Sequence, residues 1–303
     1  MLRLGGSGFA AGVAAYVIWG LFPLYWPLLR PAGAVEILAH RILWSAITMG
    51  VLVIALGRTA AFRTIATTPR TRRFLLVGAL VITSNWATYI WGVNHDHVVE
   101  TSLGYFINPL VTVLMGVFVL GESMRRLQWA ALGVAGVAVV VLTIDYGRPP
   151  WVALILAFSF GTYGLAKKQA DAGAVESLAF ETAVLTPFAA AYVGWLMVSG
   201  QSTFGVEGGG HALLLASTGI VTAIPLICFG AAATRLSMVT LGLLQFLAPV
   251  LQFLVGLLIV GEEMPLGRWV GFTLVWLALV VFTTESITHR RRQLTLSAEA
   301  SAL

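Results

Sequence analysis

The sequence predicts an all-α polytopic membrane protein with ten transmembrane helices in a five-plus-five inverted repeat. Three observations predict this fold class. The 303-residue chain is 58% hydrophobic and only 10% charged, with a mean hydropathy of +0.90; its apolar residues form long continuous runs; and its two halves repeat each other. A chain with so few polar residues cannot cover the surface of a soluble globular protein. The composition therefore excludes a cytosolic enzyme, a secreted domain and a nucleic-acid-binding protein.

The ten predicted spans are apolar runs close to the 20 or so residues that a bilayer core of about 30 Å requires. In order they are 9–29, 35–56, 74–93, 98–120, 127–144, 151–166, 177–198, 212–233, 239–260 and 266–284. The first run carries Pro23 and Pro27 where a signal peptide would have a small-residue cleavage site, so we predict a retained helix.

The basic residues predict the orientation. If the N-terminus is cytoplasmic, fourteen of the 18 Lys and Arg residues lie on the cytoplasmic side, three lie outside (Arg30, Arg148 and Arg268) and Arg41 lies within a span. Cytoplasmic loops of membrane proteins collect Lys and Arg. We therefore predict a multi-pass protein of the plasma membrane, the inner membrane in bacteria, with both termini in the cytoplasm.

The two halves repeat at an offset of 140 residues. The sequence GAVE at 33–36 recurs at 173–176, and 109–129 aligns without gaps to 249–269. The predicted division is a first repeat at 1–145, an inverted second repeat at 146–288 and a short cytoplasmic tail at 289–303. Five spans per half, an odd number, give the halves opposed topology, which is typical of secondary transporters. The alternative is a duplicated scaffold that transports nothing.

Several segments carry a family resemblance. They are AYVIWGLFPLY (15–25), EILAHR (36–41), NW (85–86), LGYFINPL (103–110), SFGTYGL (159–165), PL (225–226) and AAATRL (231–236). Together they resemble the EamA family of the drug/metabolite transporter superfamily, in particular its RarD-type transporters. The resemblance implies the ten-helix inverted-repeat fold and a transporter role, and it does not supply a substrate.

Charged side chains inside predicted spans require a reason, because each costs about 2.5–3.5 kcal/mol or more on insertion. Glu36 and His40 share one face of the second span, with Arg41 turned by about 100° from His40. The three side chains are either a proton-coupling or anion-contacting cluster, or a helix-start glutamate beside an arginine that reaches the interface. The repeat makes Arg41 equivalent to Glu181, about 10 Å away along the membrane normal, which is too far for a straightforward salt bridge.

Two prolines at matching positions, Pro109 and Pro249, are predicted to break the fourth and ninth spans. Broken helices at matching positions of the two halves point to a binding site near the midplane. The predicted lining consists of aromatic and amide side chains: Tyr16, Trp19, Asn85, Tyr89, Tyr105, Asn108, Tyr163, Gln245 and Gln252. The alternative is that the amides bond neighbouring helices and the aromatics pack or lie at the interface. Ala131, Gly133, Ala135 and Gly136 predict a close helix-packing face.

Several motifs are missing from the chain. It has no GxxxxGK[ST], HExxH or GxSxG motif, so we expect neither a nucleotide-driven pump nor an enzyme. His95, Asp96 and His97 lack further ligands nearby, so we expect a solvated loop, no metal and no cofactor. The predicted function is secondary transport of a small organic solute, a metabolite or drug-like molecule, by alternating access. Export is the expected direction, and protons are an expected coupling partner. The lipid bilayer surrounds the protein, and a homodimer is left open. The rival function is a non-transporting membrane sensor or scaffold.

Overall fold

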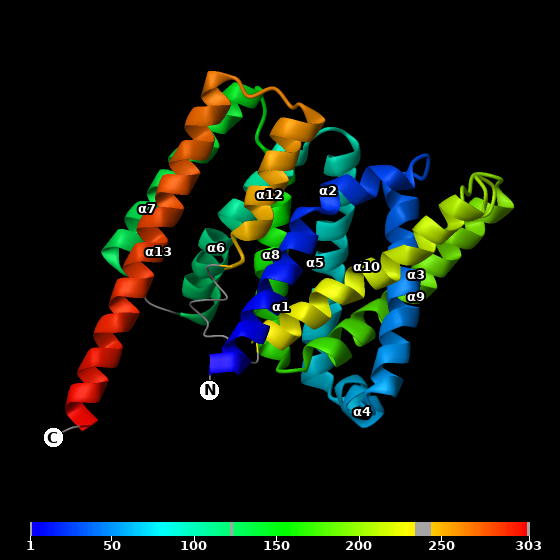
Figure 1. Ribbon diagram of the computed structural model, residues 1–303, viewed down its shortest axis with the longest axis horizontal. Helices are drawn as coiled ribbons and strands as arrows, with labels where there is room; N and C mark the ends of the chain where they lie inside the picture. Colours follow the sequence, from blue (N-terminus) through cyan, green and yellow to red (C-terminus); the bar gives the residue numbers. More distant parts are fainter. Residues whose placement is uncertain (1, 122–123, 234–243, 302–303) are drawn as a thin grey trace.

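The computed structural model describes residues 2–121, 124–233 and 244–301, and within these ranges every regular element is a helix (Figure 1). The first half contains a bent segment, four long helices and one short helix. Their bounds are α1 (Leu2–Gly20), α2 (Phe22–Tyr25), the 3₁₀ turn η1 (Trp26–Leu29), α3 (Ala34–Ala55), α4 (Thr59–Thr67), α5 (Pro69–Asn94), α6 (Val98–Leu120) and α7 (Arg126–Tyr146). The second half contains α8 (Trp151–Ala170), α9 (Ala174–Val198), α10 (Gly209–Ala233), α12 (Leu247–Val255), the π-helical turn η2 (Gly256–Val260) and α13 (Leu266–Ser301).

Seven helices of the described chain are long and apolar enough to cross a membrane, and the count is eight when the pair Gly8–Gly20 and Phe22–Leu29, bent by 44°, is taken as one span. The remaining two predicted spans fall on shorter apolar helices, Trp151–Lys167 and Leu247–Val260. The prediction of an all-helical polytopic membrane protein is therefore confirmed. The count of ten spans stays a prediction, and part of the ninth, 239–243, lies outside the described residues.

The two prolines do not interrupt their helices in the same way. Helix α6 continues through Pro109, whose missing N–H leaves only the carbonyl of Tyr105 without its usual partner. Ahead of Pro249, in contrast, a turn at Gln245 and Phe246 precedes the start of α12. Helix α6 is thus continuous at Pro109, and Pro249 lies in the first turn of α12. That the two prolines mark a binding site near the midplane stays a prediction.

Helix pairs with partners in both halves build the molecule. Helix α7 runs along α13 at one end of the bundle, and α3 packs on α9 toward the other end (Figure 1). Between them, α8 packs against both α5 and α6, while α1 packs against α10 and α12. One apolar core lies around α3, α5 and α9, and a second lies between α6, α7, α12 and α13.

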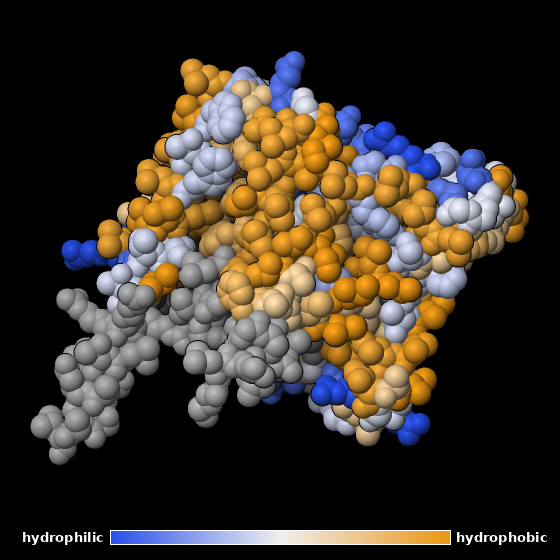
Figure 2. Space-filling view, viewed as in Figure 1, coloured by the Kyte–Doolittle hydropathy of each residue, from blue (hydrophilic) through white to orange (hydrophobic). Residues whose placement is uncertain are grey.

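The surface of the bundle is apolar. Apolar side chains cover most of the middle of the visible face, with hydrophilic residues gathered toward its edges (Figure 2). Five large side chains on five different helices are each more than two thirds exposed: Ile54, Leu80, Ile144, Phe188 and Leu213. Each would lose about 1.5–3 kcal/mol of burial energy in water, so this surface fits contact with lipid.

The predicted packing face of α7 is half wrong. Ala131 and Ala135 are buried, with Ala138 continuing the same stripe toward α13. Gly133 and Gly136 are exposed, and a Cβ added to either would meet nothing within 4 Å. The reason is helical periodicity: 131, 135 and 138 share a face, whereas the two glycines lie on the face turned away.

Candidate functional site

Arg41, in the second turn of α3, is a buried cation held by aromatic rings. It is 5% exposed, and its guanidinium carbon lies 4.0 Å from the ring centroid of Trp86 and 5.0 Å from that of Trp26. Its Nε donates a hydrogen bond to Thr222 Oγ1 of α10 at 3.1 Å. Cation–π contacts contribute about 2 kcal/mol or more when desolvated, so the rings stabilise part of this charge. Among the described residues, no carboxylate pairs with Arg41.

A glycine permits the contact between α3 and α10. A Cβ on Gly219 would lie 2.5 Å from the carbonyl carbon of Trp44 and 2.7 Å from Thr48 Oγ1, both on α3. Only glycine lets the two backbones approach this closely. Thr222, one turn further along α10, thereby reaches Arg41.

A hydrogen-bond network around Asn85 joins three helices beside this cation. Asn85 Nδ2 donates to the carbonyl oxygen of Leu156 at 3.1 Å and to Ser159 Oγ at 2.9 Å. Tyr105 donates its hydroxyl proton to Asn85 Oδ1 at 3.3 Å, and its ring lies 5.7 Å from that of Tyr89. The network thus connects α5, α6 and α8 and places three of the predicted lining residues together.

A second group of predicted lining residues joins α1 to α12. Gln252 Nε2 donates to the carbonyl oxygen of Trp19 at 3.1 Å. The rings of Trp19 and Tyr16 meet edge to face, with their centroids 5.4 Å apart. Asn108 and Gln245 are half-buried and share no hydrogen bond within the described chain. The hydrogen bond of Asn108 is instead with Thr112, one turn along α6, at 3.4 Å.

Glu181 forms an ion pair that the sequence analysis missed. Lys167 Nζ lies 2.8 Å from Glu181 Oε1, and Tyr163 donates its hydroxyl proton to Glu181 Oε2 at 3.0 Å. Lys167 also donates to Ser177 Oγ at 2.6 Å. The predicted sixth span ends at residue 166, so Lys167 was counted as cytoplasmic; α8 in fact continues to Ala170 and carries the lysine to α9. Glu181 therefore pairs with Lys167 and not with Arg41.

Glu36 and His40 contact the loop after α9, whereas Arg41 contacts other segments. Glu36 Oε1 accepts the backbone N–H of Thr203 at 2.8 Å and the hydroxyl of Ser202 at 3.3 Å, in the loop after α9. The ring of His40 stacks on Phe204 at 4.8 Å, and neither of its nitrogens has a hydrogen-bond partner within the described residues. Glu36 thus fastens the loop after α9 to α3, a role that the sequence did not indicate, and its part in proton coupling stays a prediction.

Glu176, which the repeat makes equivalent to Glu36, bonds the loop of the first half. Glu176, in the first turn of α9, accepts a hydrogen bond from Arg58 in the loop after α3, at 2.5 Å. Each of the two repeat-related glutamates therefore holds the loop that follows the other's helix.

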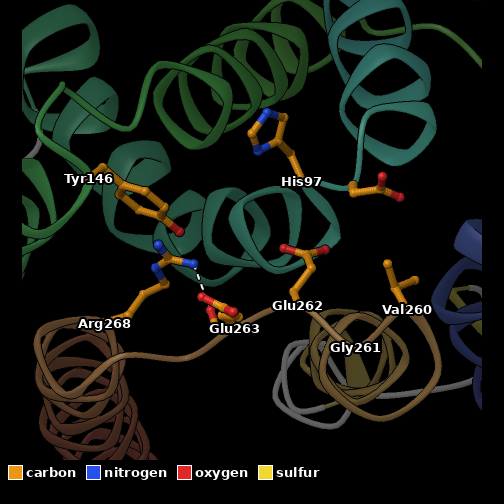
Figure 3. A pocket seen from close by; sticks show the side chains of 8 residues that line it. His97, Tyr146, Val260, Gly261, Glu262, Glu263 and Arg268 are labelled. Carbon is orange, nitrogen blue, oxygen red and sulfur yellow. Dashed lines mark hydrogen bonds between the residues drawn. The ribbon is translucent and has the colours of Figure 1, made fainter.

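A polar pocket lies at the end of the bundle away from α4. It has a volume of about 360 Å³ and is lined by Asp96, His97, Tyr146, Val260, Gly261, Glu262, Glu263 and Arg268. Figure 3 shows the carboxylate of Glu262 across from His97, and below Tyr146 it shows Arg268 donating a hydrogen bond to the backbone carbonyl oxygen of Glu263. Both oxygens of Glu262 accept the backbone N–H of Val99, at 3.1 and 3.2 Å, and so close the start of α6 against the segment after η2. No group of three or more metal-ligating side chains is found among the described residues.

The Glu262 contact is expected to depend on pH. Burial raises the pKa of Glu262 to about 7, against the lowering effect of the Val99 and Val98 amides and of Arg268, while Asp96 raises it slightly. Opening the contact returns the carboxyl to water and its pKa toward 4.5. The closed form therefore binds a proton that the open form releases between about pH 4.5 and 7, so the contact is stabilised as pH falls through that window and weakened as pH rises.

This expectation can be measured as a distance across the contact. In a Cys228→Ser background, spin labels at residues 95 and 266 should report a larger open population at pH 8 than at pH 5. His97 faces the same pocket, and burial lowers its pKa, so the Glu262→Gln variant is needed to separate the two groups. Glu262→Gln should remove the pH dependence, whereas Glu263→Gln, an exposed neighbour, should keep it. A pH dependence that survives Glu262→Gln would assign the effect to another group.

Known proteins resemble this chain over nearly its whole length, and a family model matches its first half. Residues 6–144 match the model of the EamA-like transporter family. The chain is 56% identical to "Protein RarD" of Streptomyces exfoliatus over 97% of this chain and 94% of that protein. It is 41% identical to "Protein RarD" of Escherichia coli K12, covering 94% and 97%, and 39% identical to the transporter YojE of Bacillus subtilis, covering 91% and 93%. A solved structure titled "Crystal structure of protein" superposes with a TM-score of 0.58 at 18% identity, over 92% of this chain and 98% of that one, which supports the fold.

Proposed function

The chain belongs to the EamA-like transporter family, as a RarD-type membrane transporter, and from this premise we propose that it moves a small organic solute by alternating access. The solute is a metabolite or a drug-like molecule, and the direction is export. The observation that carries the proposal is the set of buried polar groups where helices of the two halves meet: Arg41 with Thr222, and Gln252 with Trp19. Polar groups at such depth mark solute pathways in membrane proteins.

The helix pairing supports the inverted repeat that alternating access needs. Three contacting pairs join helices at the same place in the two halves, α3 with α9, α6 with α12 and α7 with α13. Two further pairs, α5 with α8 and α10 with α1, are equivalent under the 140-residue offset. The reciprocal bonds of Glu36 and Glu176 follow the same relation. All are expected of two halves related by a two-fold axis in the membrane plane.

The arrangement in space supports the proposed orientation. The start of α1, the end of α13 and the short helix α4 lie along the same edge of the molecule (Figure 1). The arginines that flank or belong to α4 are among those that the sequence assigns to the cytoplasm. We place this edge in the cytoplasm and the Glu262 contact on the outer side, and we propose that this contact closes the outer end of the solute pathway. The membrane is the bacterial inner membrane.

The experiment that tests transport uses the purified full-length protein in liposomes. Flux of a panel of labelled metabolites and drugs is measured with and without a proton gradient, and the expected result is protein-dependent flux of at least one solute. No flux and no binding across the panel would favour the non-transporting sensor or scaffold. Because the unperturbed pKa of histidine is near 6.5, His40→Gln should flatten the pH profile of flux if His40 carries the coupling proton. An unchanged profile would move that role to Glu36 or Glu181, or remove proton coupling.

Asn108→Ala provides a site-specific expectation. If its amide contacts the solute, flux per molecule should fall at least about tenfold, the loss expected for one hydrogen bond made to a charged or desolvated group, while insertion stays intact. If the amide serves only the helix, thermal stability should fall by about 0.6 kcal/mol and flux per molecule should stay near normal. Thr112→Val, which removes only the partner of Asn108, is the matched control and should leave flux unchanged.

A further inference from the structure

Arg41 differs from the other cations that the structure buries or half-buries in having no anionic partner. Among the described residues, the other partly buried cations each contact a carboxylate: Arg125 with Glu285, Arg148 with Glu100, Lys167 with Glu181 and Arg268 with Asp145. The exposed Arg58 likewise contacts Glu176. Arg41 is less exposed than any of these cations, and its polar and ring partners among the described residues are two indole rings and one hydroxyl. An uncompensated charge inside a membrane span is expensive, which calls for a counter-ion.

The guanidinium also has unused hydrogen-bond donors. An arginine side chain carries five N–H groups, and only the one on Nε has a partner, Thr222. The four N–H groups on the two terminal nitrogens make no hydrogen bond within the described chain. They form the flat fork that binds a carboxylate through two parallel hydrogen bonds.

Two neighbouring side chains present further unused donors. The hydroxyl of Tyr89 and the indole Nε1 of Trp26 are buried and have no hydrogen-bond partner among the described residues. The Trp26 ring lies against the guanidinium, and Tyr89 is close enough to it to interact electrostatically. The surroundings of Arg41 are therefore rich in donors and poor in acceptors, which favours an anion over a neutral solute.

We propose that Arg41 binds a carboxylate carried by the transported solute, with the rings of Trp86 and Trp26 against its apolar body and Tyr89 as a second donor. The proposal rests on the transport function above and names the class of its substrate. A monoanion fits better than a phosphate, because the other partly buried cations of the described residues are already paired with carboxylates and leave only the charge of Arg41 for a ligand. A dianion would remain half-compensated at this site.

Matched pairs of probes test the charge requirement. Thermal-shift measurements on the purified protein in nanodiscs use a panel of aromatic and aliphatic monocarboxylates and, for each acid, its primary amide of nearly the same shape. We expect acids to bind and their amides to bind at least about tenfold more weakly, since a hydrogen-bonded charge is replaced by a neutral group. Arg41→Gln should lower the affinity for the acids to that for the amides, and Arg41→Lys should restore part of it.

A control variant and a flux measurement complete the test. Arg30→Gln removes an exposed arginine, bonded only to the carbonyl oxygen of Asn94, and should leave the preference for acids unchanged. Acids and amides that bind alike, acid binding that survives Arg41→Gln, or no binding by any acid would each overturn the carboxylate site. If neutral solutes are transported by the wild type and by Arg41→Gln at the same rate, transport stands and only this site falls. Absence of all flux counts against the transport function itself.

Discussion

Lys167→Met is expected to lower the stability of the protein by about 3–5 kcal/mol, the loss typical of removing one partner of a buried ion pair. The side chain of Glu181 is fully buried, and Lys167 provides its charge compensation at 2.8 Å. Tyr163 would remain as a hydrogen-bond donor to the carboxylate, but it carries no charge. Thermal unfolding in detergent measures the effect, which should exceed about 6 °C in Tm.

A second substitution separates charge from packing. Lys167→Met combined with Glu181→Gln leaves no charge at this site and keeps an acceptor for the Tyr163 hydroxyl. The double variant should recover most of the lost stability, because the unpaired carboxylate is gone. If the double variant is as unstable as Lys167→Met alone, Lys167 acts through its packing and its bond to Ser177, and the ion-pair interpretation is wrong.

Gly219→Ala is expected to produce the second large effect. The added methyl group would overlap the backbone of Trp44, which cannot rotate away as a side chain would. Overpacking typically costs about 1–3 kcal/mol, and a clash against backbone belongs at or above the top of that range. Because α10 must move away from α3, Thr222 also loses its bond to Arg41, so solute binding should weaken together with Tm.

The matched control is the same substitution at an open glycine. Gly136→Ala places a methyl group where nothing lies within 4 Å, in the middle of α7. It should leave Tm unchanged or raise it slightly, since alanine is favoured over glycine by about 0.5–1 kcal/mol inside a helix. Equal losses at both positions would mean that glycine flexibility, and not the contact between α3 and α10, determines the effect.

The helices were predictable from the sequence because apolar length follows directly from bilayer thickness. Contacts between residues far apart in the sequence were less predictable. Because Lys167 is charged, hydropathy predicted that the span ends before it. The helix in fact continues to Ala170, and Lys167 pairs with the buried Glu181, which hydropathy cannot indicate. Likewise, a run of small residues predicted close packing on α7 without showing which face packs, and the contact at Gly219 carried no sequence signal of its own.

The connections within the candidate site were not predictable. Asn85, Tyr105 and Tyr89 were named as lining residues, and the structure places them in contact; that they line a solute site stays a prediction. For Arg41 the sequence left open a cluster with Glu36 and His40 or a side chain that reaches the interface, and neither alternative named the contacts with Trp86, Trp26 and Thr222 from three other segments. Such contacts depend on how α3, α5 and α10 cross, and helix crossings depend on side-chain packing that one sequence does not display.

The reciprocal bonds of Glu36 and Glu176 bear on how the chain assembles. Among the described residues, the hydrogen-bond donors to each glutamate side chain come from the other half: Glu36 accepts from Ser202 and Thr203, and Glu176 accepts from Arg58. A half-length chain inserted alone would leave a carboxylate buried without its donor, which is unfavourable. The duplicated sequence therefore encodes one cooperative folding unit, in which the half synthesised first completes its contacts only after the second has entered the membrane.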